Sequence, residues 1–129
     1  MNISIFGLGY VGCVSLGCLA KNGHFVIGVD PNTTKVDQIN SGKATIIEKD
    51  VDNIIAEQRS AGNISATMDS QLAVLKSDIT IVAVGTPSTD KGHLNLQYIL
   101  AVAENIGIAL KGKDTFHIIA IRSTIMPGT

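Results

Sequence analysis

The sequence predicts an α/β domain: a doubly wound parallel sheet between two layers of helices. Short apolar runs rich in β-branched residues alternate along the chain with segments of helical periodicity, the pattern of a three-layer α/β/α fold. The chain has 129 residues, of which 45% are apolar and 16% charged, enough to form one hydrophobic core. We therefore expect a single globular domain over residues 1–129.

The first half of the chain is predicted to fold as strand, helix, strand, helix, helix. Both strands are short and apolar. The first helix ends at Asn22-Gly23, where a glycine can adopt the left-handed conformation that ends a helix. The second and third helices each carry an apolar stripe and end at a glycine. These five elements occupy residues 2–6, 12–23, 25–29, 33–42 and 51–62.

The second half predicts a short strand, a short helix capped by Asp69, a continuously buried strand, a long helix and a last strand. These elements occupy residues 63–67, 69–77, 78–84, 94–112 and 116–121. One face of the long helix should form core, namely Leu96, Ile99, Leu100, Ala103, Ile106 and Leu110. After the last strand, Pro127 is typical of the first turn of another helix, so we expect a piece of a longer protein.

Three glycines follow the first predicted strand in the pattern GxGxxG: Gly7, Gly9 and Gly12. They open a helix that begins near Tyr10, and the next strand ends at Asp30, 18 residues beyond the third glycine. In a Rossmann-type fold, the first glycine permits a tight turn, the second lets the backbone approach a pyrophosphate, and the third lets the helix pack on the sheet. The pyrophosphate then faces the free N–H groups of the helix. The sequence therefore predicts a dinucleotide site.

Asp30 favours NAD over NADP. A carboxylate at this place accepts hydrogen bonds from the adenosine ribose hydroxyls and repels a 2′-phosphate. Lys35, one helical turn further on, is instead compatible with NADP, because its cation could pair with that phosphate. An arginine directly after the acid would be a stronger sign of NADP, and Pro31 stands there instead. NAD is therefore the predicted cofactor.

Four segments together resemble the N-terminal NAD-binding domain of the UDP-glucose/GDP-mannose dehydrogenase family. They read "ISIFGLGYVGCVSLGCLAKNGHFVIGVD", "TKVDQINSGKATIIE", "VGTPS" and "RSTIMPGT". The resemblance covers essentially the whole chain. Within the family, the last two segments resemble the GDP-mannose 6-dehydrogenases most closely, and UDP-sugar relatives stay open as an alternative.

The resemblance implies cofactor contacts from the phosphate turn, from the adenosine end and from two later strand ends. Besides the three glycines, these residues are Tyr10, Val11, Asp30, Lys35, Thr86 and Thr124. The two threonines follow predicted strands at their carboxyl ends, where open α/β sheets bind ligands.

The resemblance also implies a reaction. Family members oxidise the C6 alcohol of a sugar nucleotide to a uronate in two hydride transfers to two NAD molecules, and a cysteine carries the intermediate as a thioester. That cysteine lies, in the family, beyond the last residue of this sequence. We therefore expect no catalytic residue within 1–129 and no activity from these residues alone. The resemblance implies that the nucleotide sugar is bound mainly by the rest of the enzyme. It also implies that the whole enzyme is a homo-oligomer and serves polysaccharide biosynthesis.

Other reactive side chains have structural explanations. Cys13 and Cys18 are five residues apart on different faces of one helix, so we expect packing and neither a disulfide nor a metal pair. The three histidines, His24, His93 and His117, lack the spacing and acidic neighbours of a metal site, and no metal is predicted.

Charge and hydropathy limit the classes of partner and the cellular compartment that we expect for this protein. The net charge is −1 and the basic residues are scattered, so we expect neither nucleic acid nor a membrane surface as a partner. No apolar run reaches 18 residues and no leader pattern precedes the first strand, which favours the cytoplasm.

Two other functions fit the glycine motif. A stand-alone NAD-binding regulatory or sensor module has a similar length, glycine turn and acid. A two-domain dehydrogenase of the 6-phosphogluconate or 3-hydroxyacid type also shares the motif, but is not expected to combine it with "VGTPS" and "RSTIMPGT".

Overall fold

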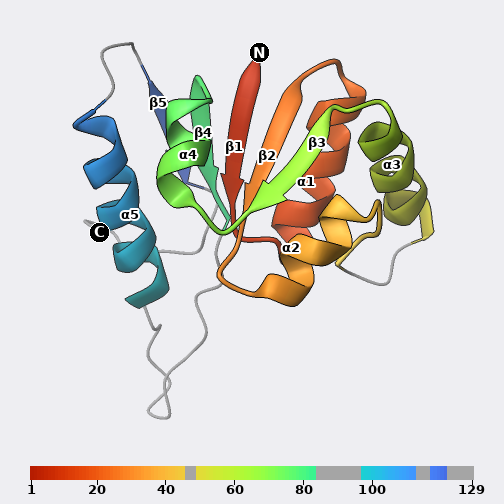
Figure 1. Cartoon of the computed structure of the whole chain (residues 1–129), viewed down its shortest axis with the longest axis horizontal. Coiled ribbons are helices and arrows are strands. Elements are labelled where there is room, and N and C mark those ends of the chain that lie inside the picture. Colours follow the sequence, from red (N-terminus) through yellow and green to blue (C-terminus); the bar gives the residue numbers. More distant parts are fainter. Residues whose placement is uncertain (46–48, 84–96, 113–116, 122–129) are drawn as a thin grey trace.

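The computed structural model describes residues 1–45, 49–83, 97–112 and 117–121 (Figure 1). Within these residues, parallel strands form one sheet in the order β3-β2-β1-β4-β5. The strands are β1 (Asn2–Phe6), β2 (Phe25–Val29), β3 (Ile64–Thr67), β4 (Ile79–Val82) and β5 (Ile118–Ile121). The helices are α1 (Tyr10–Lys21), α2 (Thr33–Asn40), α3 (Lys49–Ser60), α4 (Ser70–Leu75) and α5 (Gln97–Leu110). The predicted α/β class and order of elements are confirmed.

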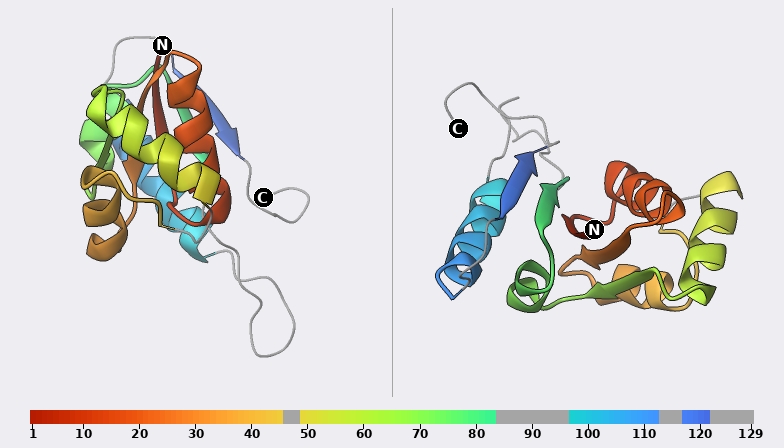
Figure 2. Two further views of the ribbon diagram at one scale, coloured as in Figure 1. Left: turned by 90° about the vertical axis from the view of Figure 1, so that its right-hand side faces the viewer. Right: turned by 90° about the horizontal axis from the view of Figure 1, so that it is seen from above.

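The chain winds outward from β1 in both directions. It passes through α1 to β2 and on to β3, then crosses back to β4, on the other side of β1. Figure 2 shows α1 and α3 on one side of the sheet and α4 and α5 on the other. The helices that follow the neighbouring strands β1 and β4 in the chain, α1 and α5, thus lie on opposite faces, which makes the carboxyl ends of these strands the topological switch point of the sheet.

Two cores fill the space between the sheet and its helices. The first lies under α1 and α3, where Leu16 and Ile55 are fully buried against Ile5. The helices approach closely there, because a Cβ on Gly17 would lie 3.1 Å from Cγ2 of Ile54. The second core lies under α4 and α5. Its buried residues are Phe6, Val29, Ala73, Val74, Val82, Ile106 and Ala109.

Most of the predicted helix ends are where the sequence puts them. Gly23, Gly42 and Gly62 have φ angles of +96°, +79° and +81°, which end α1, α2 and α3 in the left-handed region. The Asp69 carboxylate accepts a hydrogen bond from the N–H of Leu72 over 3.1 Å and so caps α4 as expected.

The predicted core face of α5 is partly wrong. Ile106 is buried and Leu110 half-buried, but Leu100 is 58% exposed and Ala103 is exposed as well. Ala109 is buried in their place. Leu96 and the side chain of Ile99 lie outside the described residues. Because α5 is apolar on most of its circumference, periodicity did not single out one face, and packing against both α4 and the sheet decided it.

The predicted continuous burial of β4 is also only partly right. Thr80 and Val82 are buried on the α5 side, whereas Ile79 and Ile81, which alternate with them, are half-buried. Every residue of β5 is exposed, because β5 is the edge strand of the described sheet.

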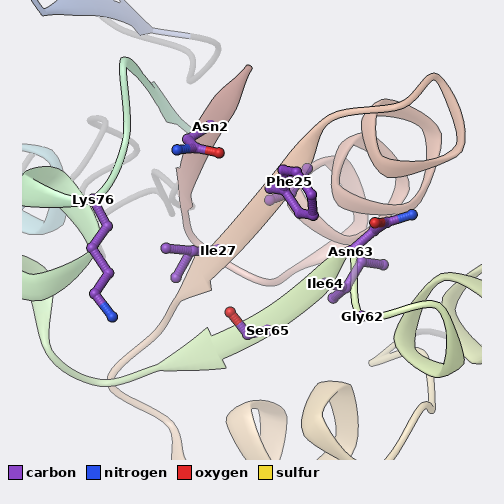
Figure 3. A pocket seen from close by; sticks show the side chains of 9 residues that line it. Asn2, Phe25, Ile27, Gly62, Asn63, Ile64, Ser65 and Lys76 are labelled. Carbon is purple, nitrogen blue, oxygen red and sulfur yellow. The ribbon is translucent and has the colours of Figure 1, made fainter.

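An open hollow of about 340 Å³ lies at the amino ends of β1, β2 and β3, beside α4 (Figure 3). Phe25, Ile27 and Ser65 line its sheet side and Lys76 stands across from them. The glycine turn lies at the other, carboxyl edge of the same strands. This hollow is therefore separate from the predicted dinucleotide site. In the part of the chain that the structure describes, no helix is both long and apolar enough to span a membrane.

Candidate functional site

The turn after β1 has a backbone that only glycine tolerates at two positions. Gly7 has a φ of +99°, and its N–H donates to the carbonyl of Val29 over 2.8 Å. A Cβ on Gly12 would lie 1.7 Å from the carbonyl oxygen of Gly7. The first turn of α1 thus packs directly on the glycine turn, in the way that the motif predicts.

The middle glycine borders open space. Among the described residues, no atom beyond Gly9 and its two chain neighbours lies within 4 Å of the place that a Cβ on Gly9 would occupy. Gly9 is the N-cap of α1 and provides no side-chain cap, and Cys13 N–H is the first amide to bond back, to the Gly9 carbonyl over 2.9 Å. Among the described residues, the N–H groups of Tyr10 and Val11 therefore meet no acceptor.

These free amides make the N-terminus of α1 suitable for an anion. The helix dipole adds a partial positive charge at the same point. Tyr10 and Val11 are 64% and 42% exposed, so a ligand can reach the amides from solvent. The turn thus has the room, the donors and the field that a pyrophosphate needs.

Asp30 lies directly after β2 and is buried. Its Oδ2 accepts a hydrogen bond from the N–H of Leu8 and its Oδ1 one from the N–H of Asn32, both over 2.9 Å. The sequence predicted Asp30 only as an acceptor for ribose hydroxyls. Each carboxylate oxygen has two lone pairs, so the structural bonds leave one on each oxygen for a ligand.

Lys35 lies in the first turn of α2, at the same edge of the sheet as Asp30, and is half-buried. Asn32 caps this helix, because its side-chain oxygen accepts from the N–H of Thr34 over 2.9 Å. The structure therefore brings Gly7, Gly9, Asp30 and Lys35 to one edge of the sheet.

Two of the predicted contact residues, Thr86 and Thr124, lie outside the described residues. They follow β4 and β5 along the chain, and the end of β4 is beside the end of β1: Phe6 pairs with Val82 in the sheet.

Sequence reasoning missed three residues of the turn's support. The side chain of Leu8 is fully buried, and a Cβ on Gly28 would lie 2.6 Å from its Cδ2. The Thr45 hydroxyl donates to the Leu8 carbonyl over 2.6 Å. A glycine inside a strand signals a close approach and could have pointed to Gly28. No local signal marks Thr45, which is 37 residues from its partner.

The two cysteines of the chain are both free. Cys13 is buried in the core under α1, as expected, whereas Cys18 is exposed. The packing role predicted for Cys18 is therefore wrong. Its side of α1 faces solvent because the sheet and α3 cover only the opposite part of the helix.

The histidines of the described residues lie apart. His117 directly precedes β5, and its Nε2 is 2.6 Å from the hydroxyl of Thr80 in β4. His24 lies in the turn between α1 and β2. His93 is outside the described residues. Over the described ranges, no group of three or more His, Cys, Asp or Glu side chains is placed to hold a metal ion.

Comparison with known proteins agrees with this geometry. A family model described as the UDP-glucose/GDP-mannose dehydrogenase family, NAD binding domain, matches residues 1–129. The GDP-mannose 6-dehydrogenase of Pseudomonas aeruginosa is 49% identical over 129 residues, which cover 100% of this chain and 30% of that enzyme. The UDP-glucose 6-dehydrogenase of Rhizobium meliloti is 38% identical over 130 residues, which cover 100% of this chain and 29% of that enzyme.

Solved structures give the same result. A ternary complex of GDP-mannose dehydrogenase from Pseudomonas aeruginosa superposes with a TM-score of 0.98 at 49% identity, over 100% of this chain and 30% of that one. A UDP-glucose dehydrogenase from Pyrobaculum islandicum gives 0.93 at 34% identity, over 99% of this chain and 30% of that one. The chain thus spans about a third of the length of these relatives. It belongs to the UDP-glucose/GDP-mannose dehydrogenase family, as its NAD-binding domain.

Proposed function

We propose that residues 1–129 are the cofactor-binding domain of a longer enzyme that oxidises the C6 alcohol of GDP-mannose to the uronate. The order of identities supports this substrate over UDP-glucose. Six GDP-mannose 6-dehydrogenases are 45–49% identical to the chain over 129 residues, whereas two UDP-glucose enzymes are 36% and 38% identical over 129 and 130 residues. The comparisons give no support to a stand-alone sensor module.

The residues of the carboxyl edge fit NAD. Gly9 leaves room for a pyrophosphate against the backbone, and the amides of Tyr10 and Val11 offer it hydrogen bonds. Gly7 and Gly12 hold the turn that presents these amides. Asp30 receives the adenosine ribose, with Lys35 beside it. Thr86 and Thr124 are proposed to contact the nicotinamide half, on the family resemblance.

NAD, when bound, supplies the hydride acceptor for an alcohol oxidation. Going from a primary alcohol to a carboxylate removes two hydrides, so each turnover needs two NAD molecules in turn and one water. The domain's own part is to bind the nucleotide in one orientation, through the amides of the turn and the carboxylate of Asp30. The sugar nucleotide, the reactive thiol and the contacts between subunits are assigned to the remaining two thirds of the polypeptide. We also propose that the enzyme works in the cytoplasm, in polysaccharide precursor synthesis.

The experiment is a steady-state assay of the full-length enzyme. Purified protein is mixed with NAD or NADP and with GDP-mannose or UDP-glucose, and absorbance at the nicotinamide band is followed. We expect rapid reduction only with NAD and GDP-mannose, and two NADH for each uronate formed. Faster turnover of UDP-glucose would contradict the proposed substrate, and one NADH per product would contradict oxidation to the acid.

A further inference from the structure

Leu8, between Gly7 and Gly9, is held at both of its backbone polar groups and at its side chain. Leu8 N–H donates to Asp30, the Leu8 carbonyl accepts from the Thr45 hydroxyl over 2.6 Å, and the side chain is fully buried over Gly28. Two of these anchors come from β2 and the residue that follows it. The third comes from the connection between α2 and α3.

The bond from Thr45 has a directional consequence. The Leu8 carbonyl and the Gly9 N–H belong to the same peptide unit, which is planar and trans, so they point in opposite directions. Holding the carbonyl oxygen toward Thr45 therefore directs the Gly9 N–H away from Thr45. Gly9 is also the residue whose Cβ position borders open space and whose carbonyl starts the hydrogen bonds of α1.

Thr45 is itself held in place. The N–H of its neighbour Ala44 donates to Oδ1 of Asp52 over 2.9 Å, in the first turn of α3, and Ala44 is buried in the core under α1. The Thr45 hydroxyl is thus presented to the turn by a braced backbone, and is itself part-buried. A fixed donor limits the entropy that the turn loses when a ligand arrives.

We propose that Thr45 is a positioning residue of the cofactor site: its hydroxyl orients the Leu8-Gly9 peptide so that the turn is ready to receive a pyrophosphate. This rests on the cofactor site proposed above. Thr45 acts through the backbone, so it should matter for ligands that carry a diphosphate and not for the nucleoside alone.

The test uses the full-length polypeptide and three ligands: NAD, ADP and adenosine. Thr45→Val removes the hydroxyl at nearly constant volume, Thr45→Ala does so without a branched side chain, and Thr45→Ser keeps the hydroxyl. Ser60→Ala removes an exposed hydroxyl at the end of α3 and is the matched control. Calorimetry or NMR titration gives each Kd. Melting temperature and hydrogen exchange of the Leu8 amide are measured without ligand.

We expect Thr45→Val and Thr45→Ala to bind NAD and ADP about threefold to tenfold more weakly, with adenosine unchanged. The Leu8 amide should exchange faster in both variants, because an unanchored Leu8-Gly9 peptide lets Leu8 move and so weakens the neighbouring bond from the Leu8 N–H to Asp30. Thr45→Ser should restore wild-type binding, and Ser60→Ala should change nothing.

Two results would overturn the proposal. Wild-type affinity for ADP in both hydroxyl-free variants would show that the turn needs no such anchor. An equal loss for all three ligands, together with a lower melting temperature, would make Thr45 a purely structural residue. If the unaltered protein binds neither NAD nor ADP, the cofactor site fails first, and that result is seen without any variant.

Discussion

The backbone N–H of Leu8 donates a hydrogen bond to Oδ2 of Asp30 over 2.9 Å. Leu8 follows β1 and Asp30 follows β2, so this bond joins the two places that the motif assigns to the pyrophosphate and to the ribose. The other carboxylate oxygen accepts from Asn32 at the start of α2. A single buried side chain thus holds the turn, the second strand and the second helix together, at the place where the ribose is proposed to bind.

Replacing Asp30 with alanine should therefore weaken both cofactor binding and the fold. The loss of a charge-assisted acceptor should cost about 1–3 kcal/mol of NAD affinity, or roughly five- to 150-fold in Kd. Discrimination against NADP should relax, since the charge that repels a 2′-phosphate is gone. The N–H groups of Leu8 and Asn32 lose their acceptor, which should lower the melting temperature. Calorimetry with both cofactors and a thermal melt measure these effects.

The control for Asp30→Ala is Asp37→Asn, which removes a charge from an exposed position on α2. It should leave binding and melting nearly unchanged. Equal affinities of the unaltered protein for NAD and NADP would refute a selective role of Asp30.

Gly9→Val should abolish NAD binding and spare the fold. Its side chain would enter the open space beside the turn, where the pyrophosphate is proposed to lie, and its Cβ would clash with no atom of the described residues. Gly12→Ala is the contrasting variant. Its Cβ would overlap the Gly7 carbonyl at 1.7 Å, so this protein should fail to fold. Normal NAD binding by Gly9→Val in a fluorescence titration would show that the turn is structural only.

Gly28→Ala should destabilise the protein through Leu8. The new methyl group would lie 2.6 Å from Leu8 Cδ2, and overpacking of this kind costs about 1–3 kcal/mol. Combining it with Leu8→Ala should cost less than the sum of the two single changes, because each frees the space that the other needs. Denaturant unfolding of the four proteins gives this coupling.

Gly107→Ala is the control for Gly28→Ala. Gly107 lies inside α5, and apart from the backbone of that helix no described atom lies within 4 Å of its Cβ position, so alanine there should raise stability by about 0.5–1 kcal/mol. Strict additivity of Gly28→Ala and Leu8→Ala would mean that the two residues do not support each other.

Cys18 should be the more reactive of the two cysteines in the folded protein. It is exposed on α1, whereas Cys13 is fully buried in the core. A chromogenic thiol reagent should therefore modify Cys18 quickly and Cys13 only after unfolding. Peptide mass mapping identifies the site. Because Cys18 lies on the outer face of the helix, Cys18→Ala should leave the activity of the proposed longer enzyme unchanged. Loss of activity would contradict the view that Cys18 has no part in the reaction.

Local signals in the sequence were enough for the order of elements and for the glycine turn. Gly23, Gly42 and Gly62 mark helix ends because a left-handed backbone is a property of a single residue. The roles of Gly7 and Gly12 in the turn are likewise readable, because strand, turn and helix are contiguous. The contacts of Thr86 and Thr124 stay predictions.

The sequence by itself thus determined the α/β class, the winding of the chain and the dinucleotide motif, since these depend on periodicity and on residues close together in the chain. Only the tertiary structure decided which face of α5 is buried, that Cys18 is exposed, and that Leu8 is held by Asp30 and Thr45. These depend on how segments 20 or more residues apart pack against one another. Burial and hydrogen-bond partners arise from that packing, which a local pattern does not contain.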